Sequence, residues 1–372
     1  MAKLFRNYNT LAEYEADTNK PVNTVCFIKD TKVIYVDDIQ YSYKQLDYLP
    51  PATSEAEALE YMGKIIKNAQ EVGLIDINKP KCVIYYSIAW DSTSAPPDHI
   101  YMNNINVNGK LYNHEDLVKI DNKQYFKVTV NENIIESINP ADEYANGFRN
   151  LIFENAVPSE KCNNLFNCHY YLESVDFGNK WDTSNVTNMC NMFGECYKLK
   201  TIKPSISGWN ISNVTDISDM FNMCQNVSDE VIPKCTPSYN ITNLSRMFAK
   251  TNVSEPDFSW WDSGENGFMV NYLDEMFASC KNLKNVNFNS IIMPYIKSTS
   301  YMFYGCSNLI WIDFGKIDLS NVDISNMNNM FKGCNNLKHI MISNELTNNY
   351  KTRDKIVEQL ANDGIKGVEI TF

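Results

Sequence analysis

The feature that most constrains the fold is a Met-Phe dipeptide that recurs along the C-terminal two-thirds of the chain. A degenerate copy, Leu165-Phe166, precedes six full copies. Successive copies are 26 to 29 residues apart, at Met192-Phe193, Met220-Phe221, Met247-Phe248, Met276-Phe277, Met302-Phe303 and Met330-Phe331. A step this regular predicts a solenoid, in which each unit is one supersecondary element stacked on its neighbours.

The residues around each dipeptide repeat with it. Apolar residues three and six positions before the Met define one face of a short helix or 3₁₀ turn. Four positions after the first residue of the dipeptide stands His169 or Thr251 in two units and cysteine in five. A fixed inward position suits small core residues such as cysteine. We interpret these cysteines, together with the Phe of each full dipeptide, as a structural ladder: Cys196, Cys224, Cys280, Cys306, Cys334, Phe193, Phe221, Phe248, Phe277, Phe303 and Phe331. A metal array or a redox relay is the alternative.

A strand is expected after each turn, because inward apolar residues such as Ile312/Phe314 alternate with period two. The outward residues of stacked strands would form one continuous surface. We predict that it binds a protein or a glycan through Trp311, Asp313, His339, Met341 and Lys203, since an exposed aromatic offers a large contact. The alternative is a merely solvated sheet face with a buried Trp. Prolines interrupt the strand in two units and predict a bulge or side loop there, at Pro233, Pro237 and Pro256.

The remaining segments predict smaller elements. Apolar runs at 25–28 and 33–36 indicate a hairpin, and Asn108-Gly109 is a type I′ turn signal between short strands. Helical spacing is found at 54–73 and at 352–361, the latter followed by Gly364 and a strand-like segment at 368–372. The predicted class is α+β, a small N-terminal β/α domain followed by a leucine-rich-repeat-like solenoid with a C-terminal helix-strand cap. The predicted boundaries are 1–50 for a β unit, 51–140 for an α/β docking or oligomerisation segment, 150–345 for the solenoid and 346–372 for the cap.

The repeat resembles the BspA-type leucine-rich repeats of bacterial surface proteins, which are also frequent in mycoplasma surface proteins. The resemblance covers residues 160–345. Its carriers are Trp181-Asp182-Thr183-Ser184-Asn185-Val186-Thr187-Asn188-Met189 and the core Met-Phe-x-x-Cys-x-x-Leu, as in Met302-Phe303-Tyr304-Gly305-Cys306-Ser307-Asn308-Leu309. The resemblance implies a solenoid with an adhesive role at a cell surface.

A second, shorter resemblance concerns residues 27–36, which look like the openings of virion proteins of gut phages. It leads us to expect a non-enzymatic phage virion structural protein, namely a head fibre, decoration or tail-fibre component. Its N-terminal part would form a homo-oligomer and contact other virion proteins, and its solenoid would bind a protein or glycan on a host surface. A bacterial cell-surface adhesin and an intracellular protein-interaction scaffold are the alternatives.

Charge and motif content argue against other functions. With 33 basic and 45 acidic residues the net charge is −12, which would repel nucleic acid. The sequence contains no run of 18 to 20 apolar residues, so we expect no membrane insertion. The first residues lack the apolar stretch of an export signal. The pairs Cys162/Cys168 and Cys190/Cys196 are spaced more widely than zinc ligands usually are. Four scattered histidines match no catalytic motif, so we expect no enzyme activity, metal or cofactor.

Overall fold

The computed structural model describes residues 5–8, 11–16, 25–28, 33–36, 39–42, 82–88, 104–113, 116–130, 133–140, 148–231, 234, 236–288 and 291–372. Two compact units divide the chain, Met1–Pro80 and Lys81–Phe372. The fold combines α and β structure and is rich in sheet, which agrees with the predicted α+β class. The predicted helix at 54–73 lies outside the described residues.

The first unit contains a four-stranded sheet in the order β1-β2-β3-β4. Its strands are β1 (Phe5–Tyr8), β2 (Val25–Ile28), β3 (Val33–Val36) and β4 (Ile39–Ser42), with helix α1 (Leu11–Ala16) between the first two. Strands β1 and β2 are parallel, and the other neighbours are antiparallel. The hairpin predicted at 25–28 and 33–36 is therefore confirmed.

The second unit begins with a six-stranded sheet in the order β15-β14-β12-β5-β9-β8. Its strands are β5 (Cys82–Ile88), β8 (Asp116–Ile120), β9 (Lys123–Val130), β12 (Phe148–Glu154), β14 (Ser174–Asp176) and β15 (Thr201–Lys203). A three-stranded sheet combines β6 (Asn104–Val107), β7 (Lys110–Asn113) and β11 (Ile138–Pro140), and β10 (Ile134–Ile135) pairs with β13 (Val157–Pro158). The type I′ turn between β6 and β7 is confirmed, with φ of 51° at Asn108 and 79° at Gly109.

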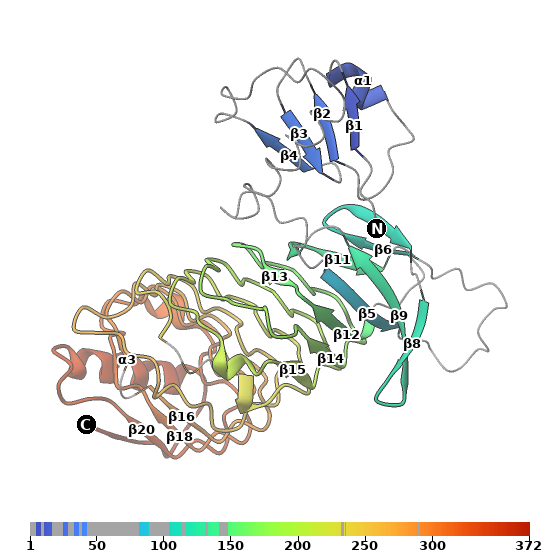
Figure 1. Cartoon of the computed structure of the whole chain (residues 1–372). Coiled ribbons are helices and arrows are strands. Elements are labelled where there is room, and N and C mark those ends of the chain that lie inside the picture. Colours follow the sequence, from blue (N-terminus) through green and yellow to red (C-terminus); the bar gives the residue numbers. More distant parts are fainter. Residues whose placement is uncertain are drawn as a thin grey trace. The chain divides into compact units, whose positions relative to one another are not determined.

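The predicted boundary between residues 140 and 150 needs correction. Strand β12 is antiparallel to β5 on one side and parallel to β14 of the first repeat unit on the other. One sheet thus joins β5, β8 and β9 to the repeats (Figure 1). Pairing between strands that are distant in sequence leaves no local signal. The chain divides into its two compact units after Pro80, and not between residues 140 and 150.

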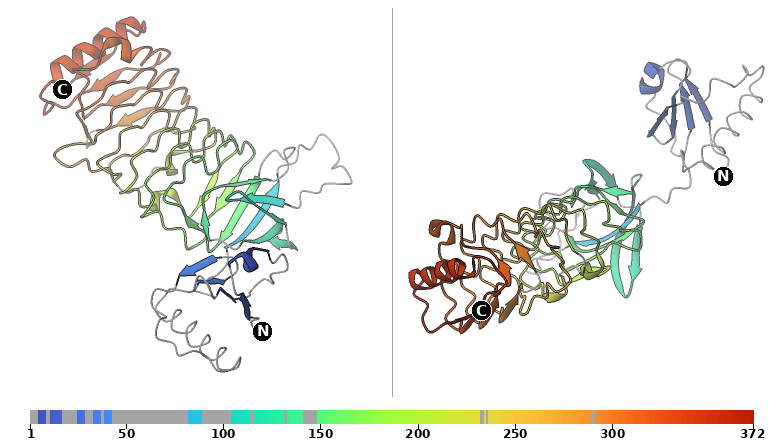
Figure 2. Two further views of the ribbon diagram at one scale, coloured as in Figure 1. Left: turned by 90° about the horizontal axis from the view of Figure 1, so that it is seen from above. Right: turned by 90° about the vertical axis from the view of Figure 1, so that its left-hand side faces the viewer.

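The repeat units stack through main-chain hydrogen bonds from each unit to the next. The amide of every ladder Phe except the last, Phe331, donates to the carbonyl of the next unit's Met, as from Phe277 to Met302 and from Phe303 to Met330, both at 2.9 Å. Parallel strands β16 (Asn285–Asn287), β18 (Trp311–Asp313) and β20 (His339–Met341) continue the pattern, and β17 (Ile292–Met293) pairs with β19 (Lys316–Ile317). Figure 2 shows these units following one another toward the C-terminal helix.

The position just before the Met of the dipeptide adopts a left-handed backbone conformation whatever its side chain. Just before the Met stand Asp219, Arg246, Glu275 and Tyr301, with φ between 53° and 59°. Such conformations are costly for non-glycine residues. The amide of Arg246 reaches the carbonyl of Asp274 at 2.9 Å, and that of Glu275 reaches Ser300 at 2.9 Å. Hydrogen bonds to the next unit therefore offset the backbone strain.

The interior is a stack of aromatic rings and thiols. Adjacent ladder phenylalanines are nearly parallel, with ring centroids 5.8 Å apart for Phe277/Phe303 and 6.2 Å apart for Phe303/Phe331. Each ladder cysteine is buried, and its thiol contacts the Phe carbonyl of the preceding unit, as from Cys306 to Phe277 at 3.0 Å. That carbonyl also accepts the amide of Cys280 at 3.1 Å. The thiol thus satisfies the second lone pair of a buried carbonyl, which explains why a weak donor occupies this position.

His169 occupies the ladder position in the first unit, and its burial there predicts that the protein is less stable in acid. Its ring is buried and stacks on Phe148 with centroids 5.4 Å apart. Burial lowers the pKa of His169 despite backbone hydrogen bonds that favour the charged form. The unfolded chain therefore takes up this proton first, and stability should decrease as the pH falls below about 6.5.

His169→Cys, which restores the residue of the other units, should remove part of that loss. The measurement is the melting temperature of both chains at pH 7.5 and at pH 5.5. An equal acid-induced decrease in the two would contradict the assignment to His169.

The C-terminal residues close the stack. Helix α3 (Asn349–Asn362) ends before Gly364, and β21 (Glu369–Thr371) pairs in parallel with β20, so the predicted helix and strand are confirmed. A carboxylate oxygen of Asp363 accepts the amide of Phe331 at 2.8 Å, where another unit's carbonyl would otherwise stand. Ile356 and Leu360 on α3 are buried. The cap therefore satisfies the open amides and covers the last apolar layer.

Candidate functional site

The outward residues of the parallel strands lie in registered rows. In one row Asn285 of β16, Trp311 of β18, His339 of β20 and Glu369 of β21 are successive partners. Trp311 is half-buried and His339 is exposed, with its Nδ1 3.2 Å from a carboxylate oxygen of Glu369. Met341, also half-buried, lies two residues further along β20. The structure thus brings three of the predicted binding residues, Trp311, His339 and Met341, onto neighbouring strands.

Asp313 does not belong to this exposed surface. Its side chain is 1% exposed, although the period-two pattern placed it outward. Its Oδ1 accepts the amide of Gly315 at 2.7 Å, and Asp176 makes the same contact to Gly178 at 2.9 Å. Burial raises the pKa of Asp313, partly offset by that hydrogen bond. Asp313 is the last residue of β18, and a turn follows it. The hydrogen bond from Gly315 holds the carboxylate against this turn, where a ligand does not reach it.

Lys203 is exposed, but it lies on β15 in the six-stranded sheet, whereas Trp311 lies in the four-stranded sheet β16-β18-β20-β21. Between the two sheets the units of Met220 and Met247 have no strand at this position within the described residues. In place of a strand they have the 3₁₀ turn η2 (Asp229–Val231) and an isolated bridge between Asp257 and Asn287. The predicted interruption near the prolines is confirmed, and it separates Lys203 from the other candidates.

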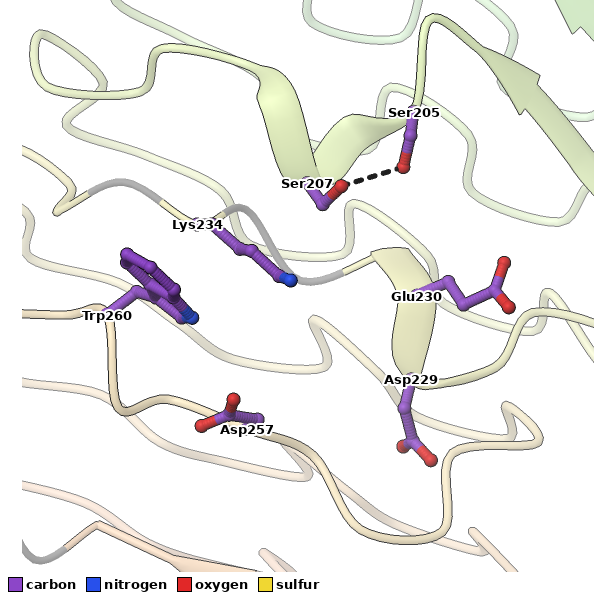
Figure 3. Close-up of a pocket in the computed structure, with 7 residues that line it drawn as sticks. All are labelled: Ser205, Ser207, Asp229, Glu230, Lys234, Asp257 and Trp260. Carbon is purple, nitrogen blue, oxygen red and sulfur yellow. Dashed lines mark hydrogen bonds between the residues drawn. The ribbon is translucent and has the colours of Figure 1, made fainter.

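A polar hollow of about 250 Å³ occupies this interruption. Figure 3 shows its seven lining side chains around an open middle, with Trp260 on one side and Glu230 on the other. They come from the turn η1 (Ile206–Gly208) and the residue before it, from η2, from Lys234 beyond η2, and from the segment after Met247. The lining residues are Ser205, Ser207, Asp229, Glu230, Lys234, Asp257 and Trp260.

The local sequence explains why an indole faces this hollow. Trp261 begins a Trp-Asp-Ser segment that corresponds to Trp181 and Trp209 of earlier units, and all three indoles are buried. The core position can hold only one of two adjacent tryptophans. Trp260 is therefore displaced outward and is 54% exposed, whereas Trp261 is 1% exposed.

Hydrogen bonds hold the walls of the hollow. The carboxylate of Asp229 accepts the amide of Ser254 at 2.9 Å and its hydroxyl at 2.8 Å, which fixes η2 against the next unit. The hydroxyl of Thr236 donates to the carbonyl of Trp260 at 3.2 Å. The hydroxyls of Ser205 and Ser207 hydrogen-bond each other at 2.9 Å. The scaffold is thus tied down while Glu230, Trp260 and Lys234 are exposed.

The electrostatics of the hollow combine one amine with three carboxylates. The Nζ of Lys234 lies 5.8 Å from the ring centroid of Trp260, within the range of a cation–π contact. Hydrogen bonds from Ser259 lower the pKa of Asp257, and the charge of Lys234 adds to the effect. Asp257 is therefore ionised at neutral pH. The lining carries a net negative charge and offers both donors and acceptors.

A shallow groove connects the hollow to the strand row. Its lining residues are Glu255, Pro256, Asp257, Asn285, Asn287 and Trp311, so that Asp257 borders both features. The side-chain amide of Asn285 donates to a carboxylate oxygen of Glu255 at 3.1 Å. We call the hollow, the groove and the exposed row through Trp311 and His339 the strand-side surface.

Sequence reasoning missed the hollow because its residues fall where the repeat pattern fails. Strand prediction relies on alternating apolar residues, and 229–237 has none that match the other units. One signal was present. The doubled Trp260-Trp261 supplies one more aromatic than the Trp-Asp-Ser motif can bury.

The ladder thiols are poor candidates for chemistry. Desolvation by burial raises the pKa of Cys280 to about 11 and that of Cys334 to about 12, so both are protonated at neutral pH. Nine described cysteines are free. Within the described part of the chain, no group of three or more His, Cys, Asp or Glu side chains is arranged to hold a metal ion. The thiol of a buried cysteine is neither a good nucleophile nor a good ligand in this form.

Among the helices that the structure describes, none is both long and apolar enough to cross a bilayer.

Comparison with known proteins identifies one family. A family model described as "Mycoplasma protein of unknown function, DUF285" matches residues 160–266 and 234–345. Together the two matches cover residues 160–345, which is half of the chain. No curated protein and no solved structure matches the sequence.

Proposed function

Because the chain belongs to the family described as Mycoplasma protein of unknown function, DUF285, we propose that it is a non-enzymatic binding protein whose repeats form a leucine-rich-repeat-like solenoid. The strand-side surface carries this proposal. Its residues come from successive units at equivalent positions, as with Asn285, Trp311 and His339. In a solenoid such positions make one extended contact face, which a single globular core does not provide.

Two observations support the solenoid. The inter-unit hydrogen bonds repeat at equivalent atoms, and the ladder phenylalanines stack in order along the chain. The match of the family model to residues 160–345 covers the same region as the BspA-type resemblance. A binding role without catalysis is supported by the protonated ladder thiols and by the scatter of the four histidines along the chain.

The setting that we propose is a phage particle, with the N-terminal part as a homo-oligomer docked to virion proteins and the strand-side surface directed to a protein or glycan of the host. The resemblance of residues 27–36 to virion proteins of gut phages motivates this assignment. Mass spectrometry of purified particles should find the chain as a component. Its recovery in a bacterial cell envelope instead would favour the adhesin.

Binding to intact bacteria tests the function itself. A fluorescently labelled full chain should be retained by one or more strains of a panel, and Trp311→Ala should weaken retention at least tenfold while the melting temperature changes little. Buried aromatic anchors commonly contribute about 2 kcal/mol or more to a complex.

Tyr304→Ala is the matched control, because Tyr304 is an exposed aromatic on the turn of the same unit. It should leave retention unchanged. If Trp311→Ala has no effect on retention, the proposed surface is wrong. If it lowers the melting temperature sharply, the indole serves the fold, and the surface loses its central residue. Treating the cells with protease or with periodate then identifies the partner as protein or glycan.

A further inference from the structure

The hollow between the six-stranded sheet and the four-stranded sheet β16-β18-β20-β21 offers a more specific inference, which rests on the proposed binding function. An exposed indole stands beside three carboxylates, one amine and two hydroxyls. We propose that this hollow is a glycan-binding site, and that it takes a neutral sugar whose ring packs on Trp260.

The indole supplies the apolar contact that a sugar needs. One face of many pyranose rings is made of C–H groups, which pack against an aromatic ring while the hydroxyls point outward. Trp260 is 54% exposed, and its main chain is held by Thr236. An indole has only two rotatable side-chain bonds, so little conformational entropy is lost when a ligand covers it.

The polar groups around the indole match the hydroxyls of a sugar. Ionised carboxylates accept strong hydrogen bonds from O–H groups, and the amine of Lys234 donates to sugar oxygens. In Figure 3 the carboxylate of Asp257 and the amine of Lys234 lie on the Trp260 side of the hollow, whereas the carboxylate of Glu230 points away from its middle. Asp257 thus offers an acceptor and Lys234 a donor to a ligand seated on Trp260.

Charge and size narrow the class of ligand. Three carboxylates against one amine repel acidic sugars, as does the net charge of −12. The hollow, at about 250 Å³, suits one or two sugar rings. A protein interface would need a larger area with an apolar centre, and Trp260 is the single aromatic residue of the lining. A protein partner is therefore an outcome of the test rather than the proposal.

The experiment uses the full chain on an array of neutral oligosaccharides, built from hexoses, N-acetylhexosamines and deoxyhexoses, beside sugars that contain uronic or sialic acid. At least one neutral glycan should be retained. Trp260→Ala should weaken its binding at least tenfold, and Asp257→Asn should weaken it severalfold. Tyr295→Ala, which removes an aromatic of similar exposure outside the hollow, should bind as the unaltered chain does.

Three results would overturn the proposal: no neutral glycan retained, retention that Trp260→Ala leaves unchanged at an unaltered melting temperature, or retention of acidic sugars alone. Cells separate this failure from failure of the proposed function. Binding to bacteria that protease abolishes and periodate spares would keep the binding function and remove the glycan. Absence of binding to every strain would remove both.

Discussion

Replacing Phe303 with alanine should lower the free energy of unfolding of the repeat region by about 3–5 kcal/mol. The ring of Phe303 is fully buried between Phe277 and Phe331 and meets the edge of Phe314 at 6.2 Å. Its loss leaves a cavity that both neighbouring units line. Because an isolated unit cannot bury enough surface to fold, the damage should spread to those neighbours first.

Hydrogen–deuterium exchange of the full-length variant measures this spread. Amide protection should decrease in the units of Met276 and Met330 as well as in the unit of Met302, with more distant units less affected. Tyr304→Ala serves as the control, since the residue next to Phe303 is exposed and its loss should leave protection unchanged. Exchange that increases in the substituted unit alone would show that the units fold independently.

The second large effect is expected in the C-terminal cap. Ile356→Ala on α3 should cost about 2–5 kcal/mol, because its side chain is fully buried against the last unit. Loosening α3 should also release Asp363 from the Phe331 amide, which leaves a buried donor unsatisfied. The amides of the last two units should therefore lose protection before those of the first units.

Val357 provides the control on the same helix. It is 44% exposed, so Val357→Ala removes a methyl pair at a solvated position and should change stability by less than about 0.5 kcal/mol. Thermal unfolding of both variants is the measurement. If the two substitutions have equal effects, α3 does not act as the cap.

The ladder and the cap could be predicted because their signals are local and repeated. Cys306 and Phe303 recur at fixed offsets in unit after unit, and every copy needs the same inward environment. The cap is marked by apolar residues at helical spacing and by Gly364, which has a φ of 75° that suits glycine at a helix end.

The backbone conformations and the sheet that joins the units could not be predicted in this way. Arg246 and Tyr301 adopt left-handed conformations that their side chains do not favour, because hydrogen bonds to the next unit impose them. Strand β5 pairs with β12 some sixty residues later, and neither segment carries a mark of the other. Such features arise from packing between units rather than from local sequence.

The candidate site was predicted in part for a related reason. Period-two alternation correctly placed Trp311 and His339 outward. It failed for Asp313, whose carboxylate accepts a hydrogen bond from the Gly315 amide and is buried. The hollow depends on the units in which the pattern is lost, so a method based on repeats cannot find it. The pair Trp260-Trp261 needed a structure to show which indole is exposed.

Hydroxyl-radical footprinting of the full chain, free and bound to a strain that retains it, tests most directly whether the strand-side surface is the binding face. Oxidation of Trp260 and Trp311 should decrease on binding, while Tyr301 and Tyr304, exposed on the turns, should be oxidised as in the free chain. Protection of Tyr301 and Tyr304 with unchanged oxidation of both tryptophans would place the partner on the turns and contradict the account.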